Sequence, residues 1–279
     1  MRFKSFFVNR LNAYIKPYFI LCGINLVLCI IQEIIKNRVA VETFSLVGKW
    51  IYGILYVYPS VEYMPNCTPL WFLVALFFAN IIFYFILEVR SNRTQILIIM
   101  ILVITDMLLY YMVDFQMIWC LGAILLGTCC MYFGFYIRYN MQSRVASKSI
   151  IPILMIIGIL SGYVNGRVGV GANNLGRYPL LFWVSALTIS LAILLYASIW
   201  NPKISLLNWF GRNTMLFMGF NYFFNSFPEF IWNHVMPFAK YHYPWYIKSF
   251  VCVFCITCVI ILWNKLKTKW PSLIDVVGF

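Results

Sequence analysis

Long apolar segments alternate with short polar ones along the chain, and eight of the apolar segments are long enough to cross a bilayer. A hydrocarbon core about 30 Å thick needs a helix of about 20 apolar residues. The predicted spans are 14–35, 70–87, 96–113, 117–137, 150–165, 179–200, 206–227 and 246–263. The pattern therefore predicts an all-α fold, a polytopic integral membrane helix bundle with about eight transmembrane helices.

Two further segments are predicted to lie beside these spans. The apolar run 44–58 is shorter and is interrupted by Gly48 and Gly53, which indicates a re-entrant or interfacial piece. The segment 1–12 is basic and amphipathic, which is typical of a cytoplasmic interfacial helix. Since no repeat or soluble domain is recognisable, we expect residues 1–279 to form a single membrane-embedded domain.

The composition excludes most soluble classes. Hydrophobic residues make up 63% of the chain and charged residues only 10%, whereas soluble domains carry about 25% charged residues. The net charge of +13 does not indicate nucleic-acid binding, because the basic residues lie at the ends of apolar segments. The expected partner is the lipid bilayer.

The basic residues also predict the orientation. Of the 21 Lys and Arg residues, 14 fall on the side of the N-terminus when the predicted spans are threaded through a membrane. Because cytoplasmic loops are enriched in Lys and Arg, we expect both termini to be cytoplasmic.

The cysteines indicate no metal centre. Cys252, Cys255 and Cys258 repeat at every third position, but neither His nor a carboxylate joins them. We expect these thiols to act as small apolar groups in a core. Cys67 alone of the nine cysteines lies in a predicted loop, so it should be accessible to an impermeant thiol reagent added outside the cell.

Glycines mark a packing face rather than a nucleotide site. Gly158, Gly162 and Gly166 are spaced by four, which gives a helix one smooth face for close packing. The glycine-rich stretch 166–176 does not match a dinucleotide-binding fingerprint, because its last motif position, 174, is Asn.

Three residues are candidates for acid–base chemistry. Asp106 lies near the middle of a predicted span, where a charge costs about 2.5–3.5 kcal/mol. It should face the bundle interior, be protonated or pair with a base, and both a functional role and a buried structural hydrogen bond remain open. His234 and His242 share the outer segment 227–245 with Glu229. An acid–base or metal pair is conceivable there, but an interfacial loop rich in amphipathic rings is the preferred interpretation.

Polar residues that could bind ligands gather on both predicted faces. The outer set suits a sugar or another neutral polar ligand and comprises Asn165, Arg167, Asn173, Asn174, Arg177, Tyr63, Asn66 and Trp71. The inner set suits a phosphate-bearing donor and comprises Arg10, Lys16, Arg138, Arg144 and Arg212. Orientation signals and headgroup contacts are the alternative explanation for most of them.

Four stretches, in order along the chain, carry a family resemblance. They read NRLNAYIKPY at 9–18, PLWFLVALF at 69–77, PLLFWVSAL at 179–187 and LNWFGRNTM at 207–215. Together they resemble segments of the membrane acyltransferase-3 family, in particular its fucose 4-O-acetylase-like branch. The resemblance implies transfer of an acyl group, usually acetyl, from cytoplasmic acyl-CoA to a hydroxyl of a cell-envelope carbohydrate, in the cytoplasmic (inner) membrane.

The resemblance also suggests roles for individual residues. Arg10 is expected to contact the phosphates of acyl-CoA, which is the donor substrate, and no bound cofactor or metal is implied. Trp71, Asn174 and Arg177 are expected on the sugar side. Asn213 is grouped with this substrate-binding set and is expected to orient within the bundle.

The chain departs from the family at its catalytic positions. The family's first two helices, which carry an arginine about ten residues before the expected catalytic histidine, are expected to be missing. Ala13 and Asn221 stand where the family has a basic residue and often a histidine. We therefore expect the isolated chain to be inactive. The alternatives left open are a glycan transporter or polymerase subunit, with Asp106 lining the substrate path, and an inert remnant.

Overall fold

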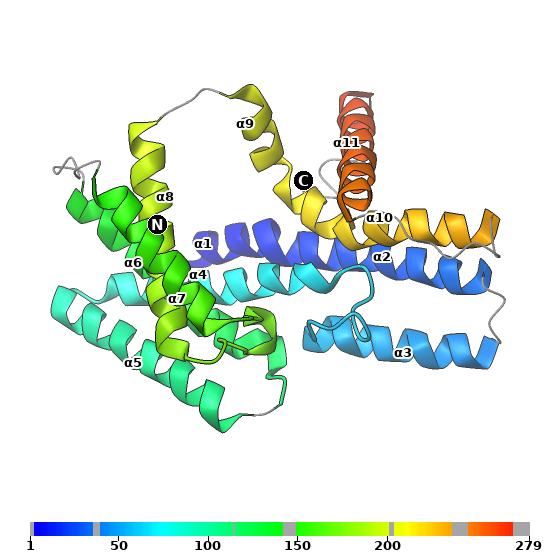
Figure 1. Cartoon of the computed structure of the whole chain (residues 1–279). Coiled ribbons are helices and arrows are strands. Elements are labelled where there is room, and N and C mark those ends of the chain that lie inside the picture. Colours follow the sequence, from blue (N-terminus) through cyan, green and yellow to red (C-terminus); the bar gives the residue numbers. More distant parts are fainter. Residues whose placement is uncertain are drawn as a thin grey trace. The chain divides into compact units, whose positions relative to one another are not determined.

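The computed structural model describes residues 3–35, 40–113, 115–141, 149–200, 204–235 and 245–269 (Figure 1). These residues form helices joined by loops, and no strand occurs among them beyond an isolated bridge between Gly169 and Asn174. The predicted all-α class is therefore confirmed. The chain divides into two compact units, Met1–Val74 with Ile204–Phe279, and Ala75–Lys203, and each is described by itself.

The first unit contains the two ends of the chain. Its elements are α1 (Phe3–Arg10), η1 (Leu11–Ile15), α2 (Lys16–Ile35), α3 (Ala40–Tyr56), η2 (Thr68–Leu70), the first turn of α4 (Trp71–Glu88), α9 (Ser205–Arg212), α10 (Thr214–Val235) and α11 (Trp245–Lys269). Helix α2 packs against α3 and α10, and α10 packs against α11. The first three elements form one unbroken helical run, so the predicted interfacial segment 1–12 continues directly into the first span.

Buried polar contacts join the helices of this unit. The Tyr18 hydroxyl donates to the carbonyl of Ile54 at 2.6 Å, which ties α2 to α3. The Asn25 amide donates to the carbonyl of Gly219 at 2.9 Å, which ties α2 to α10. A Cβ at Gly219 would lie 2.9 Å from a methyl group of Leu21, so the glycine allows α2 and α10 to approach closely.

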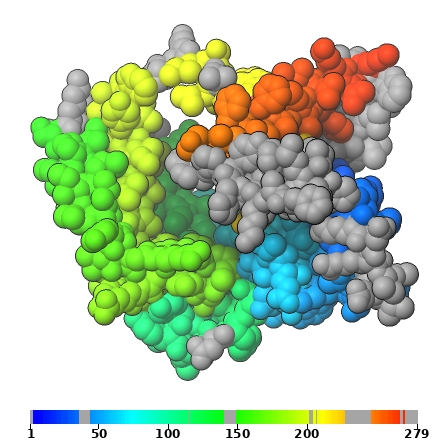
Figure 2. All heavy atoms as spheres, turned by 45° about the vertical axis from the view of Figure 1, so that its right-hand side comes forward, coloured from blue at the N-terminus to red at the C-terminus, as the bar shows by residue number. Residues whose placement is uncertain are grey.

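The second unit comprises the remainder of α4 and the helices up to α8. Its further elements are α5 (Asn92–Met112), η3 (Ile118–Cys120), α6 (Leu121–Met141), α7 (Ile150–Asn165), η4 (Val170–Ala172) and α8 (Pro179–Ile199). Helix α5 packs against α6, and α7 packs along α8. Figure 2 shows α7 and α8, in green to yellow-green, as one continuous packed surface.

The predicted glycine face is confirmed in part. Gly158 and Gly162 of α7 face α8, where a Cβ would meet Ile189 and Ser185 respectively. The Ser185 hydroxyl also donates to the carbonyl of Gly158 at 2.8 Å. Gly166 instead ends α7 with φ +78° and has no neighbour within 4 Å, so it provides a turn and not a packing surface.

Six helices among the described residues are long and apolar enough to cross a membrane. They are Phe3–Ile35, Thr68–Glu88, Asn92–Met112, Ile118–Tyr139, Pro179–Ile199 and Tyr246–Leu266. The seventh apolar helix, α7, has 16 residues and is shorter. Apolar side chains also face outward: on α5, Leu97, Ile101 and Ile104 each expose more than half of their surface. Such a surface is expected against lipid, and the chain is an integral membrane protein.

The predicted span 206–227 is not one helix. Helix α9 ends at Arg212 and α10 begins at Thr214, with Asn213 in a turn between them. The Asn213 amide donates to the carbonyl of Trp209 at 2.8 Å, and an Asn side chain that bonds the local backbone competes with helix continuation. The other irregular segment, 44–58, lies mostly in α3, a helix of 17 residues that is not one of the six.

The α7–α8 contact predicts opposite effects for two glycine substitutions. Gly158→Ala places a methyl group against Ile189 and Thr188, and overpacking of this kind costs about 1–3 kcal/mol. Gly134→Ala on α6 meets nothing within 4 Å and should be neutral or stabilising by up to about 1 kcal/mol, because alanine favours helix. Thermal unfolding of the purified variants in detergent measures both. Equal melting temperatures would contradict the close α7–α8 packing.

Candidate functional site

Asp106 is the buried ionisable group of the second unit. It lies on α5, six residues before the C-terminal end of that helix, and its side chain is 0% exposed. Neither carboxyl oxygen has a hydrogen-bond partner among the described residues. The carboxyl lies close enough to Cys129 and Cys130 on α6 to interact with them electrostatically. Asp106 therefore faces the interior, and among the described residues neither a base nor a hydrogen-bond donor pairs with its carboxyl.

The loop between α7 and α8 is organised by one side chain. The Asn165 amide nitrogen donates to the carbonyl of Leu175 at 2.8 Å, and its oxygen accepts from the Tyr178 amide at 2.7 Å. Gly176 has φ +89°, and a Cβ there would collide with the Asn165 amide. The carbonyl of Gly176 accepts from the Tyr110 hydroxyl at 2.5 Å. Asn165, predicted as a possible ligand contact, is thus 2% exposed and closes the loop.

Asn174 and Arg177, both predicted on the sugar side, lie in this same loop and are exposed. The Asn174 side-chain oxygen accepts from the Gly176 amide at 2.9 Å, and the Arg177 guanidinium lies 5.3 Å from the centre of the Tyr178 ring. Asn173 is buried, and its amide oxygen and nitrogen have no partner among the described residues. The loop therefore exposes two guanidinium groups, those of Arg167 and Arg177, and the Asn174 amide from a fixed backbone.

A tyrosine cluster stands out in the first unit. Its members are Tyr52, Tyr56, Tyr58 and Tyr63, on α3 and in the loop that follows it. Tyr52 stacks on Tyr56 with ring centres 5.4 Å apart, and Tyr58 stacks on Tyr63 at 4.4 Å. The loop folds back on the helix at Gly53, where a Cβ would strike the backbone of Tyr63. Figure 2 shows the surface of this segment in light blue.

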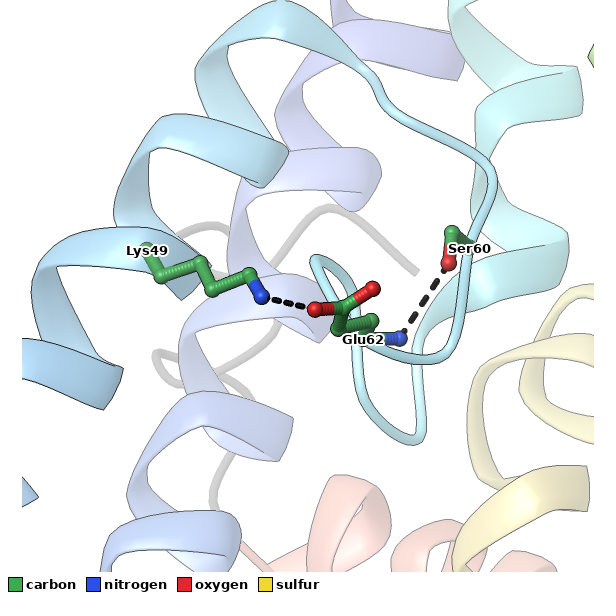
Figure 3. A network of polar contacts seen from close by, with 3 residues as sticks. All are labelled: Lys49, Ser60 and Glu62. Carbon is green, nitrogen blue, oxygen red and sulfur yellow. Dashed lines mark hydrogen bonds and ion pairs between the residues drawn. The ribbon is translucent and has the colours of Figure 1, made fainter.

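Charged and polar groups border the tyrosine cluster. Lys49 extends from α3 and pairs with the Glu62 carboxylate, while the Glu62 amide donates to the Ser60 hydroxyl at 3.3 Å (Figure 3). The Lys49 ammonium also lies 4.6 Å from the centre of the Tyr63 ring, a cation–π contact. Aromatic faces with a few fixed polar groups beside them are the composition of a polar-ligand site.

The other predicted site residues of the first unit lie at helix ends. Trp71 begins α4, is half-buried and packs edge-on against Phe72 at 6.0 Å. Arg10 ends α1, with its guanidinium 5.1 Å from the centre of the Phe6 ring. Asn213 bonds the backbone at the α9–α10 break. His242 and the side chain of His234 lie outside the described residues.

The structure brings some of the predicted residues together. Asn174 and Arg177 share one loop of the second unit, while Arg10, Trp71 and Asn213 belong to the first unit. Among the residues that the structure describes, no group of three or more His, Cys, Asp or Glu side chains could hold a metal ion.

Cys67 is not accessible, contrary to the sequence-based expectation. It is 1% exposed, and its thiol lies in hydrogen-bonding contact with the thiol of Cys22 on α2. The loop 57–67 is folded by its own backbone hydrogen bonds, among them Cys67 to the carbonyl of Pro65 at 2.8 Å, and this turn directs the side chain inward. An impermeant reagent should therefore leave Cys67 unlabelled in the folded protein.

The tyrosine cluster was missed by the sequence analysis except for Tyr63. The signal was present in the spacing of Tyr52 and Tyr56, which places both rings on one face of a helix. The return of the loop onto α3 could not be deduced from that spacing. Comparison of the chain with protein-family models, with curated proteins and with solved structures finds no match.

The unpaired carboxyl of Asp106 leads to a prediction about the folded yields of three substitutions at this position. Because its carboxyl has no partner among the described residues, Asp106→Leu and Asp106→Asn should both fold with yields at least equal to that of the native chain. Asp106→Lys should lose folded yield strongly, since a lysine at membrane depth costs about 2.5–3.5 kcal/mol on insertion scales. Size-exclusion profiles of the solubilised variants measure this. A leucine variant much less stable than the asparagine variant would reveal a polar partner.

The α7–α8 loop predicts different stabilities for two substitutions. Asn165→Ala removes the two side-chain contacts that close the loop and should destabilise the protein by about 1–3 kcal/mol. Arg177→Ala removes an exposed side chain and should change stability by less than about 0.5 kcal/mol. Thermal unfolding compares the pair, and a similar loss in both variants would count against the role assigned to Asn165.

Proposed function

We propose that this protein takes part in acyl transfer, with acetyl-CoA as donor and a hydroxyl of a cell-envelope carbohydrate as acceptor. The support is the resemblance of four ordered stretches to the membrane acyltransferase-3 family, together with the helical membrane architecture. The proposed location is the cytoplasmic membrane. Both termini are proposed to lie in the cytoplasm, because Lys and Arg are more numerous on the side of the N-terminus.

The observation that carries the carbohydrate part of the proposal is the tyrosine cluster. The four tyrosine rings are bordered by the Lys49–Glu62 pair and belong to the part of the sequence between α2 and α4. In the proposed topology α2 crosses the membrane once, so this segment is expected on the side opposite the N-terminus. Stacked rings offer flat apolar faces to a sugar ring, and the charged pair offers a donor and an acceptor to its hydroxyls. Trp71 and Asn213 of the same unit belong to the proposed substrate-binding set, and Asn174 and Arg177 form a separate proposed contact on the α7–α8 loop of the second unit.

The proposed donor contact is Arg10, at the end of α1. Its half-exposed guanidinium suits a phosphate because it presents several N–H donors in a fixed fork. In the reaction, the sugar hydroxyl oxygen bonds to the thioester carbonyl carbon, the carbon–sulfur bond breaks, and the CoA thiolate leaves. A general base accepts the hydroxyl proton and returns it to the thiolate.

The activity test uses the full chain in a strain that lacks its own O-acetyltransferases. Expressed alone, the chain should not acetylate envelope glycan above background, since a positioned base contributes about 10²–10⁴-fold and the family's Arg and His pair does not occur within these 279 residues. Co-expression with the two N-terminal helices of a family member should restore acetylation, measured as glycan acetyl content by mass spectrometry.

Two variants make this test specific. In the restored system, Tyr58→Ala should lower acetylation at least tenfold without changing the folded yield, because a stacked ring of the proposed acceptor site is lost. Tyr163→Ala is the matched control, since Tyr163 is 85% exposed on α7 and lies outside the tyrosine cluster. Failure of restoration, or equal activity of the two variants, would remove the support for an acceptor site at the cluster.

The second candidate function is glycan transport without acyl chemistry. The observation that favours it is Asp106, together with the buried indole nitrogen of Trp183, which also lacks a partner among the described residues. Unpaired polar groups at membrane depth are typical of substrate paths. Glycan flux into vesicles that falls in Asp106→Asn, with no acetyl transfer in any variant, would favour transport.

A further inference from the structure

A groove follows helices α5, α6 and α8 of the second unit. Its apolar part, of about 420 Å³, is lined by side chains that include Ile99, Val103 and Leu187, with Trp183 on α8. A second hollow of about 450 Å³ lies at the N-terminal end of α5 and is lined by Asn92, Gln95 and tyrosines of α6. Ile96, Tyr132 and Tyr136 line both hollows, so the two form one continuous groove.

The groove follows about half the thickness of a hydrocarbon core and has a polarity gradient along it. From Asn92 to Val103 it follows about 16 Å of α5, at 1.5 Å per residue. The hollow at the N-terminal end of α5 is the mouth of the groove, and it carries the amides of Asn92 and Gln95 and the rings of Tyr132, Tyr136 and Tyr139. The apolar part of the groove carries aliphatic side chains and an indole ring. Ile96 and Met100 on its wall are 44% and 55% exposed. An occupant must therefore be amphiphilic, with a polar end at the mouth and an apolar chain beyond it.

The charged side chains around the mouth of the groove indicate the charge of the occupant's polar end. Arg90 and Arg93 lie at the start of α5, and Arg138 lies in the last turn of α6, all of them exposed. The acidic side chain at this end of the unit, Glu88, is in contact with the Tyr84 hydroxyl. Gln95 is occupied, because its amide donates to the carbonyl of Val89 at 2.7 Å and accepts from Tyr132 at 3.3 Å. Arg90, Arg93 and Arg138 thus give this end of the unit a positive charge that can meet a headgroup.

We propose that the α5–α6–α8 groove binds one anionic glycerophospholipid. One acyl chain lies along Ile99, Val103 and Trp183, and the phosphate lies at the mouth beside Arg93 and Arg138. Clusters of arginine at the end of membrane helices attract anionic headgroups, and guanidinium groups match phosphate oxygens. The site does not depend on the proposed acyl transfer, and its occupant is a component of the bilayer rather than a substrate.

The test is native mass spectrometry of the full chain released from micelles that contain equal amounts of dioleoyl phosphatidylglycerol and phosphatidylcholine. The expected result is one retained phosphatidylglycerol, preferred about tenfold over phosphatidylcholine. Val103→Trp, which fills the apolar part of the groove, should reduce retention of phosphatidylglycerol about tenfold. Ile101→Trp is the control, since Ile101 is 53% exposed on α5 and does not line the groove. Arg93→Gln should reduce the preference for the anionic lipid.

Equal retention of the two lipids by the native chain would overturn the proposal, as would equal losses in the two tryptophan variants. A second measurement uses the native chain and therefore does not depend on the folding of any variant. Phosphatidylglycerol with a photoreactive diazirine in its chain should cross-link mainly to 99–103 of α5 and 129–133 of α6. Labelling spread evenly over the outward residues Leu97, Ile104 and Leu108 would show a lipid annulus only, and displacement by oleate as effective as by phosphatidylglycerol would exclude headgroup recognition.

Discussion

A buried backbone group without a hydrogen-bond partner costs free energy, and in this protein side-chain amides supply such partners where helices end, break or touch. Asn165 meets this constraint between α7 and α8, where its amide bonds the backbone of Leu175 and Tyr178. Asn213 meets it at the α9–α10 break by bonding the carbonyl of Trp209. Asn25 extends the same principle to the carbonyl of Gly219 on a neighbouring helix. The turns that hold the predicted site residues are fixed because these amides are buried and engaged.

The parts of the fold that could be predicted are those that depend on composition over a whole segment. Length and apolar content located the helices near 70–87, 96–113 and 179–200 within a few residues of the observed α4, α5 and α8, because burial in lipid is proportional to apolar area and insensitive to detail. The glycine spacing at 158 and 162 was equally readable, since a missing side chain has one steric consequence whichever helix covers it.

The parts that could not be predicted depend on single side chains that bond backbone groups. The break at Asn213 and the inward turn of Cys67 each follow from local hydrogen bonds that hydropathy does not represent. Of the candidate site, the sequence singled out Asp106, Asn174 and Arg177, which the structure places in a helix interior and on an exposed loop. It could not show that Tyr52, Tyr56, Tyr58 and Tyr63 gather, because their stacking depends on a loop that returns to Gly53.

Asp106 differs from the buried asparagines in a way that bears on function. Asn165 and Asn25 each contribute bonds that the fold requires, whereas both oxygens of Asp106 are unpaired among the described residues. A buried carboxyl without a partner lowers stability, and replacement by an apolar side chain would remove that cost. A carboxyl that closes no bond of the fold is available to hold a proton or to contact a substrate. The arginines at the groove mouth differ from these amides in being exposed, so they are available to the anionic headgroup that we propose.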